Sequence, residues 1–226
     1  MLNNLGLLVI AQGDFEAAQA MNEESLCIAR ELHDTKSIAL SLANLGSVAA
    51  EQGDHASAKA MGEESLRIFG QLGYQAGAAY ARLLLGTLAA ERGDYGFARE
   101  LLEQSLTARW KLGDRRCLAE SLEALAAVHA ALGPTTVAAE MWGQAERLRS
   151  ELGSPITPSE RVRYDPAVAA ARAASSDEAA FNEAWRKGTG DDAGRSHGPR
   201  ARPASQPRWQ RLARYRRCCY GIQGAA

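Results

Sequence analysis

The feature that most constrains this chain is a repeat with a period of 40 residues, which runs through four copies without an insertion. A period of this length is typical of stacked supersecondary units rather than of one closed domain. The copies begin at Leu2, Leu42, Arg82 and Leu122. The residues shared by all four are Leu5, Leu45, Leu85 and Leu125; Gly13, Gly53, Gly93 and Gly133; Ala18, Ala58, Ala98 and Ala138; and Leu32, Leu72, Leu112 and Leu152.

Each copy predicts two helices joined by a short turn. Leu42, Leu45 and Val48 fall on one face of a first helix. Gly53 then supplies a left-handed stop, and Asp54 is placed to cap the second helix. A helical hairpin of this kind cannot bury its apolar face alone, so stacking of the copies must complete the core.

Small residues recur where two helices have to approach closely. Gly46, Ala58 and Ser65 occupy such positions in the second copy. Ser65 has counterparts in the first and third copies, which indicates packing rather than nucleophilic chemistry. We expect Cys27 and Cys117 to be buried as small apolar side chains.

The residues from 42 to 66 and from 83 to 106 resemble the tetratricopeptide repeat in a 40-residue form. The resemblance extends over residues 2–153, which we expect to hold four repeats. It implies an all-α, right-handed superhelix of stacked helical hairpins. An armadillo or HEAT solenoid is the alternative, although the Leu-Gly, Gly-Asp and Ala spacing fits it poorly.

The same resemblance implies a concave groove that binds an extended peptide or protein segment. Asn4 and Asn44 precede the Leu-Gly pair, where an Asn amide can bond a peptide backbone; Leu84 and Ala124 replace them in later copies. The other expected groove residues are Asn3, Ala43, Leu83 and Glu123, and Leu7, Ser47, Thr87 and Ala127. The alternative is that these are ordinary packing and surface residues. The groove lacks the pair of lysines that would clamp a C-terminal carboxylate.

Residues 154–188 predict a helical cap, as the last repeat of a solenoid requires. We expect one helix from Pro158 to about Ala174 and another from Ser176 to about Gly188, while Trp142 adds bulk where the stack ends. The run from 141 to 188 resembles the C-terminal end of bacterial STAND/LuxR-type ATPase transcriptional regulators. In that family the repeats sense or bind a partner, and upstream ATPase and DNA-binding domains act.

The last segment, residues 189–226, differs sharply in composition. It holds eight Arg and two Asp, so it carries +6 while the remaining 188 residues carry -7. Its Arg, Gly and Pro content predicts disorder. The Arg and aromatic residues at 208–217 raise the alternative of a nucleic-acid or anionic-membrane binder. A functionless tail or a shifted reading frame is the favoured explanation of these residues.

The remaining features favour a non-catalytic, cytoplasmic protein that needs no cofactor or metal. The four His and four Cys show no metal-ligand or disulfide spacing, and no catalytic set stands apart from the repeat. The sequence has no phosphate-binding loop, signal peptide or long apolar run. The chain begins inside a hairpin that nothing caps, so we expect self-association or instability of the isolated chain. The sequence is consistent both with a fragment of a larger regulator and with a free-standing adaptor.

Overall fold

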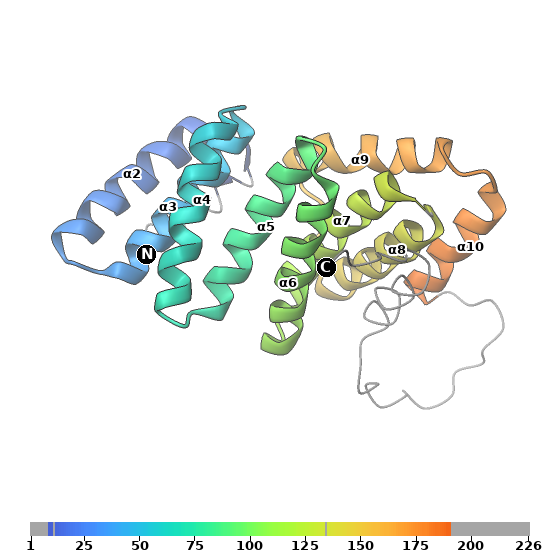
Figure 1. Ribbon diagram of the computed structural model, residues 1–226. Helices are drawn as coiled ribbons and strands as arrows, with labels where there is room; N and C mark the ends of the chain where they lie inside the picture. The colour runs from blue at the N-terminus through green and yellow to red at the C-terminus, as the bar shows by residue number, and fades with distance from the viewer. Residues whose placement is uncertain (1–8, 11, 134, 191–226) are drawn as a thin grey trace, which may run out of the picture.

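The structure, a computed structural model, describes residues 9–10, 12–133 and 135–190. In these residues the chain forms α-helices and no strands. The helices are α2 (Phe15–Glu31), α3 (Thr35–Glu51), α4 (His55–Gln71), α5 (Gln75–Glu91), α6 (Tyr95–Leu112), α7 (Arg115–Leu132), α8 (Thr135–Leu152), α9 (Pro158–Ala173) and α10 (Glu178–Thr189). Successive helices from α2 to α8 pack as neighbours in a row (Figure 1). The expected all-α solenoid of stacked hairpins is confirmed.

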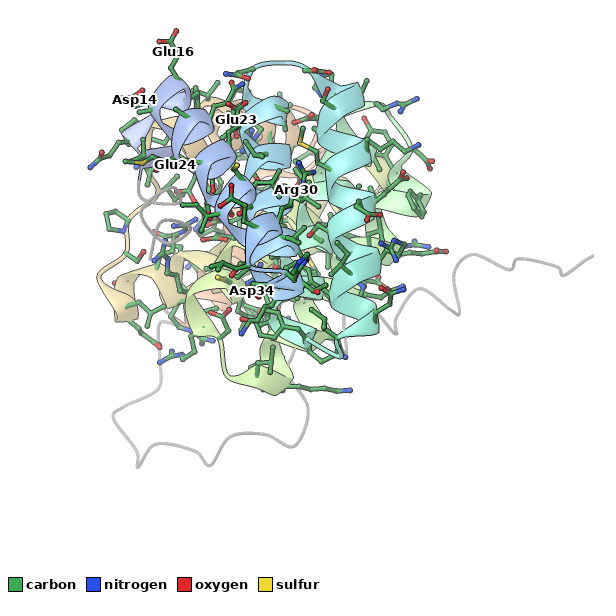
Figure 2. All side chains as sticks on the ribbon, turned by 90° about the vertical axis from the view of Figure 1, so that its left-hand side faces the viewer. Asp14, Glu16, Glu23, Glu24, Arg30 and Asp34 are labelled. Carbon is green, nitrogen blue, oxygen red and sulfur yellow. The ribbon has the colours of Figure 1, made fainter. Side chains whose placement is uncertain are left out.

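Aspartate starts most of the helices. The Asp14 and Asp34 side chains lie at the two ends of α2 (Figure 2), and each accepts a hydrogen bond from a backbone N–H in the first turn of the helix that follows it. Asp54, Asp94, Asp114 and Asp177 cap later helices in the same way. These bonds satisfy donors that a helix leaves free at its start. The predicted cap at Asp54 is therefore confirmed.

The glycine that ends each first helix of a copy is left-handed in three copies but not in the fourth. Gly13, Gly53 and Gly93 have φ of 82°, 83° and 80°. Gly133 instead has φ of 160° and ψ of -121°, so the expected left-handed stop is wrong there. The reason lies in the next residue, because Pro134 disfavours helical backbone in the residue before it.

The core lies between the paired helices, and the recurring small residues allow their close approach. Ala18, Ala58, Ala98 and Ala138 are all 0% exposed. A Cβ on Gly46 would lie 3.2 Å from the Ala58 carbonyl oxygen, so α3 and α4 could not pack as closely with a larger residue there. The predicted packing role of these small residues is confirmed.

The expectation for Cys27 is wrong, because its side chain is exposed. The buried side of α2 is formed by Ala18, Asn22, Ser25, Leu26 and Ala29. Cys27 follows Leu26 in sequence, but the turn of the helix places its side chain outside the buried face. Cys117 is partly exposed rather than buried.

The stack ends on a cluster of aromatic side chains. Trp142 of α8 is 1% exposed and its ring lies 6.4 Å from that of Tyr164 and 6.1 Å from that of Trp185. Helix α9 starts with a capping box between Thr157 and Glu160 and runs across the last hairpin to α10 (Figure 1). The predicted bulk at Trp142 thus covers the end of the core.

Helix α10 docks on α8 through two glycines. A Cβ on Gly143 would lie 2.2 Å from the Trp185 carbonyl oxygen, and one on Gly188 would lie 2.3 Å from that of Glu140. The two backbones are therefore in direct contact, which is why α10 is held firmly in place. Among the described helices, none combines the length and apolar character needed to cross a bilayer. The Arg-rich segment of residues 191–226 lies outside the described residues.

Candidate partner-binding surface

Helices α3, α5 and α7 each carry a stripe of partly exposed side chains along one side. The stripe consists of Leu40, Ser47 and Ala50 on α3; Tyr80, Leu83, Thr87 and Ala90 on α5; and Glu120, Glu123, Ala127 and Ala130 on α7. Members within one helix are three, four or seven residues apart, so they share a face. We call these three stripes, with Glu51 at the end of α3, the inner face.

Ser47 and Tyr80 join the stripes of α3 and α5. Their hydroxyl oxygens lie 2.8 Å apart, and Ser47 also donates to the Ala43 carbonyl at 3.1 Å. Burial raises the pKa of Tyr80 to about 12, although its bond to Ser47 works the other way. Tyr80 therefore stays a neutral donor and acceptor, in the middle of the surface.

The structure places the twelve predicted groove residues in three different settings. Ser47, Leu83, Thr87, Glu123, Ala124 and Ala127 are partly exposed, and all but Ala124 belong to the inner face. Ala43, Asn44 and Leu84 are buried, at 0%, 2% and 8% exposed. Asn3, Asn4 and Leu7 lie outside the described residues.

Asn44 is used inside the protein. Its amide nitrogen donates to the side-chain oxygen of Asn22 at 2.9 Å, and the Asn22 nitrogen donates to the Ala18 carbonyl at 2.7 Å. This chain of bonds links α2 to α3 in the interior. A peptide backbone would reach Asn44 only if the Asn22 bond opened and the two helices separated.

A second polar cluster lies where α5, α6 and α7 meet. Arg109 of α6 is 3% exposed; it donates to Asp114 at 3.1 Å, while its Nη2 has no hydrogen-bond partner within the described part of the chain. Burial raises the pKa of the Glu120 carboxyl, and the charge of Arg109 only partly offsets this. A partly buried carboxylate of this kind costs folding free energy at neutral pH.

Sequence reasoning missed Tyr80 and Glu120. The signal was present, because Leu40, Tyr80 and Glu120 stand 40 residues apart and thus occupy one position of the repeat. Because this position holds three unlike residues, the repeat pattern does not mark it. Variable residues at an equivalent, solvent-reachable position are what a binding surface needs.

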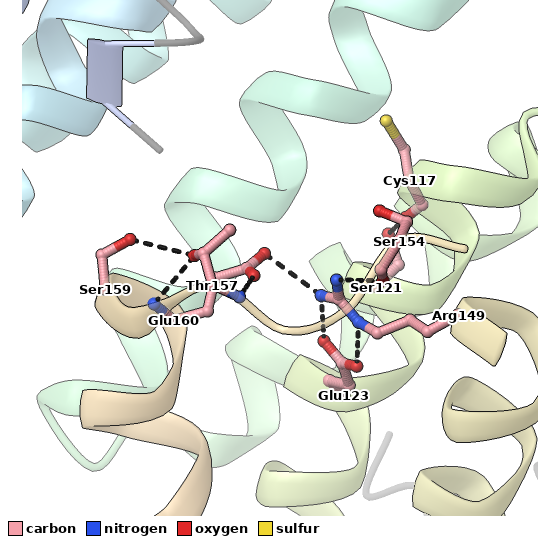
Figure 3. A network of polar contacts seen from close by, with 8 residues as sticks. All are labelled: Cys117, Ser121, Glu123, Arg149, Ser154, Thr157, Ser159 and Glu160. Atoms are coloured by element: carbon pink, nitrogen blue, oxygen red, sulfur yellow. Dashed lines mark hydrogen bonds and ion pairs between the residues drawn. The ribbon is translucent and has the colours of Figure 1, made fainter. Parts of the chain in front are cut away.

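Glu123 is tied to the end of the stack by Arg149 of α8. The Arg149 guanidinium donates to both Glu123 oxygens, at 2.6 and 2.8 Å, and to Glu160 of α9 at 3.1 Å (Figure 3). Burial works against ionisation of Glu160, but the bonds from the Thr157 backbone N–H and from Arg149 outweigh it. The pKa of Glu160 therefore lies below its ordinary value.

Reactive or metal-binding groups do not gather on this surface. Burial raises the pKa of the Cys117 thiol to about 12, so the thiolate that nucleophilic chemistry requires is scarce at neutral pH. The described residues contain no group of three His, Cys, Asp or Glu side chains arranged to hold a metal ion. The surface offers hydroxyl, carboxylate and apolar contacts instead.

The repeat has a counterpart among known families. Residues 1–71 match the family model of the tetratricopeptide repeat. The matched segment ends with the last residue of α4, and the helical hairpins continue in the same 40-residue period through α8. The chain is thus an all-α solenoid whose first third matches the tetratricopeptide repeat. Among curated proteins, no sequence matches the chain.

Proposed function

We propose that this chain is a non-catalytic scaffold that binds a protein or peptide segment on the inner face. Tetratricopeptide repeats in general mediate contacts between proteins, and the match over residues 1–71 supports that role here. The finer proposal is that the chain is the sensor or interaction part of a bacterial signalling or transcriptional regulator. Support for it comes from the resemblance of residues 141–188.

The observation that carries the proposal is the side-chain content of the inner face. Tyr80, Leu83 and Thr87 are partly exposed on consecutive turns of α5, and they combine a hydroxyl-bearing ring, an apolar chain and a small polar group. Surfaces that bind proteins combine apolar and aromatic anchors with polar groups in this way. Glu120 adds a carboxylate whose burial lowers the stability of the fold. A role in binding explains the presence of such a residue better than a role in packing does.

A matched pair of threonines tests the proposal. Thr87 lies on the inner face, whereas Thr107 is partly exposed on α6, an outer helix. We expect Thr87→Arg to abolish capture of specific proteins from a lysate of the source cells, and Thr107→Arg to leave capture unchanged. Both variants are first checked for an unaltered helical spectrum and melting temperature. Equal capture by both folded variants would contradict binding at the inner face.

The regulator context requires a different test. Sequencing of the genomic locus on both sides of this reading frame is expected to show in-frame ATPase or DNA-binding segments. Stop codons directly on both sides would contradict that part of the proposal and leave the scaffold role unaffected. The alternative of nucleic-acid or membrane binding through 208–217 concerns residues outside the described ones.

A further inference from the structure

Helix α9 is docked much more loosely than α10, although both belong to the end of the solenoid. Of the sixteen residues of α9, Ala171 is the one that is fully buried, and Val162 is 74% exposed. Helix α10, by contrast, buries Phe181 completely and crosses α8 through Gly188. Tyr164, Ala167 and Val168 of α9 do pack against the end of the core, but they are only partly buried. The local free energy of opening of α9 is therefore expected to be lower than that of α10.

Two polar links hold α9 against the inner face. Its first turn is fastened through Glu160 to Arg149, next to Glu123 of α7 (Figure 3). One turn later, Arg163 forms an ion pair with Glu51 at the end of α3. Helices α3 and α7 flank α5 in the stack, so the first two turns of α9 are linked to the helices on both sides of α5.

The Arg163–Glu51 pair is a weak and accessible contact. The two side chains are 45% and 21% exposed, and 112 residues separate them along the chain. Exposed ion pairs stabilise a structure only slightly and are screened by salt. Glu51 is therefore a carboxylate of the inner face that is paired with Arg163 of the same chain. This pairing costs little free energy to break.

The segments on either side of α9 allow it to move as a unit. Gly153, in the left-handed region with φ of 60°, and Pro155 precede it, while the bend at Ser175 and Ser176 follows it. Helix α10 stays fixed by the contact between Gly143 and Gly188. Release of α9 breaks the Glu160–Arg149 bond, the contact of Tyr164 with Trp142 and the bond from Arg172 to Asn182 of α10. It leaves the bidentate Glu123–Arg149 pair intact.

We propose that α9 is a displaceable strap over the inner face, and that a partner segment enters by placing its own arginine on Glu51 in place of Arg163. This proposal rests on the proposed function of the inner face. Arginine is the matching group because its planar guanidinium pairs with a carboxylate through two parallel hydrogen bonds. Glu120, for which no hydrogen bond or ion pair is found among the described residues, is a second acceptor on the same surface.

Hydrogen exchange of the full chain tests the strap without any partner. We expect the amides of α9 to exchange faster than those of α10 in the native chain. Arg163→Gln should speed exchange in α9 by about twofold to fivefold, the effect of losing one exposed ion pair, and leave α10 unchanged. The matched control is Arg161→Gln, because Arg161 pairs with Asp165 inside α9 itself.

Two results would overturn the strap. One is exchange of α9 amides as slow as that of α10. The other is an equal effect of Arg163→Gln and Arg161→Gln. Neither result depends on the capture experiment with Thr87→Arg. Failure of the strap and failure of the proposed function are therefore distinguishable.

The arginine exchange is tested with a synthetic peptide of residues 157–173, labelled with a fluorophore. We expect it to bind the full-length Glu160→Gln/Arg163→Gln double variant about fivefold more tightly than the native chain, because the strap of that variant is open more often. A peptide with Arg163→Gln should bind the double variant more weakly. No binding to either chain, or equal binding of both peptides, would overturn the exchange at Glu51.

Discussion

Arg149 of α8 donates two hydrogen bonds to the carboxylate of Glu123 on α7, at 2.6 and 2.8 Å. The two side chains are 8% and 11% exposed. The pair therefore links the two helices of the last hairpin at the inner face, and its third bond, to Glu160, extends the link to α9. The Arg149 guanidinium thus connects the inner face, the last hairpin and α9.

Removal of this guanidinium is expected to be costly. Arg149→Met should lower the free energy of unfolding by about 3 kcal/mol, because Glu123 is left as a partly buried charge without its partner. The measurement is urea unfolding followed by circular dichroism. Arg147→Met is the matched control, since Arg147 is 47% exposed and pairs with Glu151, which is equally exposed. A similar loss in both variants would contradict the special role of Arg149.

The charge of Glu160 should make the stability of α9 depend on pH. Because the folded pKa lies below the ordinary value of 4.5, ionisation of Glu160 stabilises the fold above that pH. The contribution is lost as the pH falls through the folded pKa. Glu160→Gln keeps the capping box and removes the charge. We therefore expect the variant to be less stable by about 1 kcal/mol at pH 7 and equal to the native chain in strong acid. A difference that persists in acid would contradict this.

The contact between α8 and α10 should tolerate no side chain. Gly188→Ala places a Cβ 2.3 Å from the Glu140 carbonyl oxygen, so we expect a loss of about 3 kcal/mol as α10 is forced away. Gly70→Ala is the control, because nothing lies within 4 Å of its Cβ position on α4. That change should stabilise the chain by about 0.5 kcal/mol. The melting temperatures of both variants measure these effects. An unchanged melting temperature of Gly188→Ala would show that the crossing at Gly188 does not hold α10.

The phenol of Tyr80 should resist ionisation. At pH 10, where an ordinary tyrosine is half ionised, Tyr80 should remain almost fully protonated, because burial raises its pKa to about 12. Near-ultraviolet absorbance of the native chain and of Tyr80→Phe measures this, since their difference isolates one phenol. A clear phenolate difference at pH 10 would mean that the phenol of Tyr80 is solvated rather than buried.

The fold was largely predictable because its determinants are local and repeated. The 40-residue period, Asp54 at a helix start and Gly53 at a helix end each act within one turn of backbone, and repetition strengthened each signal. The predicted start of α9 at Pro158 is likewise local, and the structure adds a capping box between Thr157 and Glu160. However, conservation of a residue in all four copies did not predict that its side chain is buried. The shared leucines Leu32, Leu72, Leu112 and Leu152 end the outer helices and are 40% to 72% exposed.

The candidate site was harder to predict because it depends on contacts between distant residues. Asn44 has the type and position of a peptide-binding residue, yet its amide is bonded to Asn22 in the interior. Arg163 and Glu51 are 112 residues apart in sequence and meet only because α9 lies back against the end of α3. The close approach of Gly143 to Gly188 likewise follows from how α10 docks, which no local pattern encodes.

Partners are expected to bind the inner face rather than the outer surface. Site-specific photo-crosslinking in the source cells tests it most directly, with a photoreactive phenylalanine placed at Leu83 on the inner face or at Phe97, which is 51% exposed on α6. We expect a discrete crosslinked product from position 83 and none from position 97. A product from position 97 alone would contradict it and move the binding surface to the outer helices.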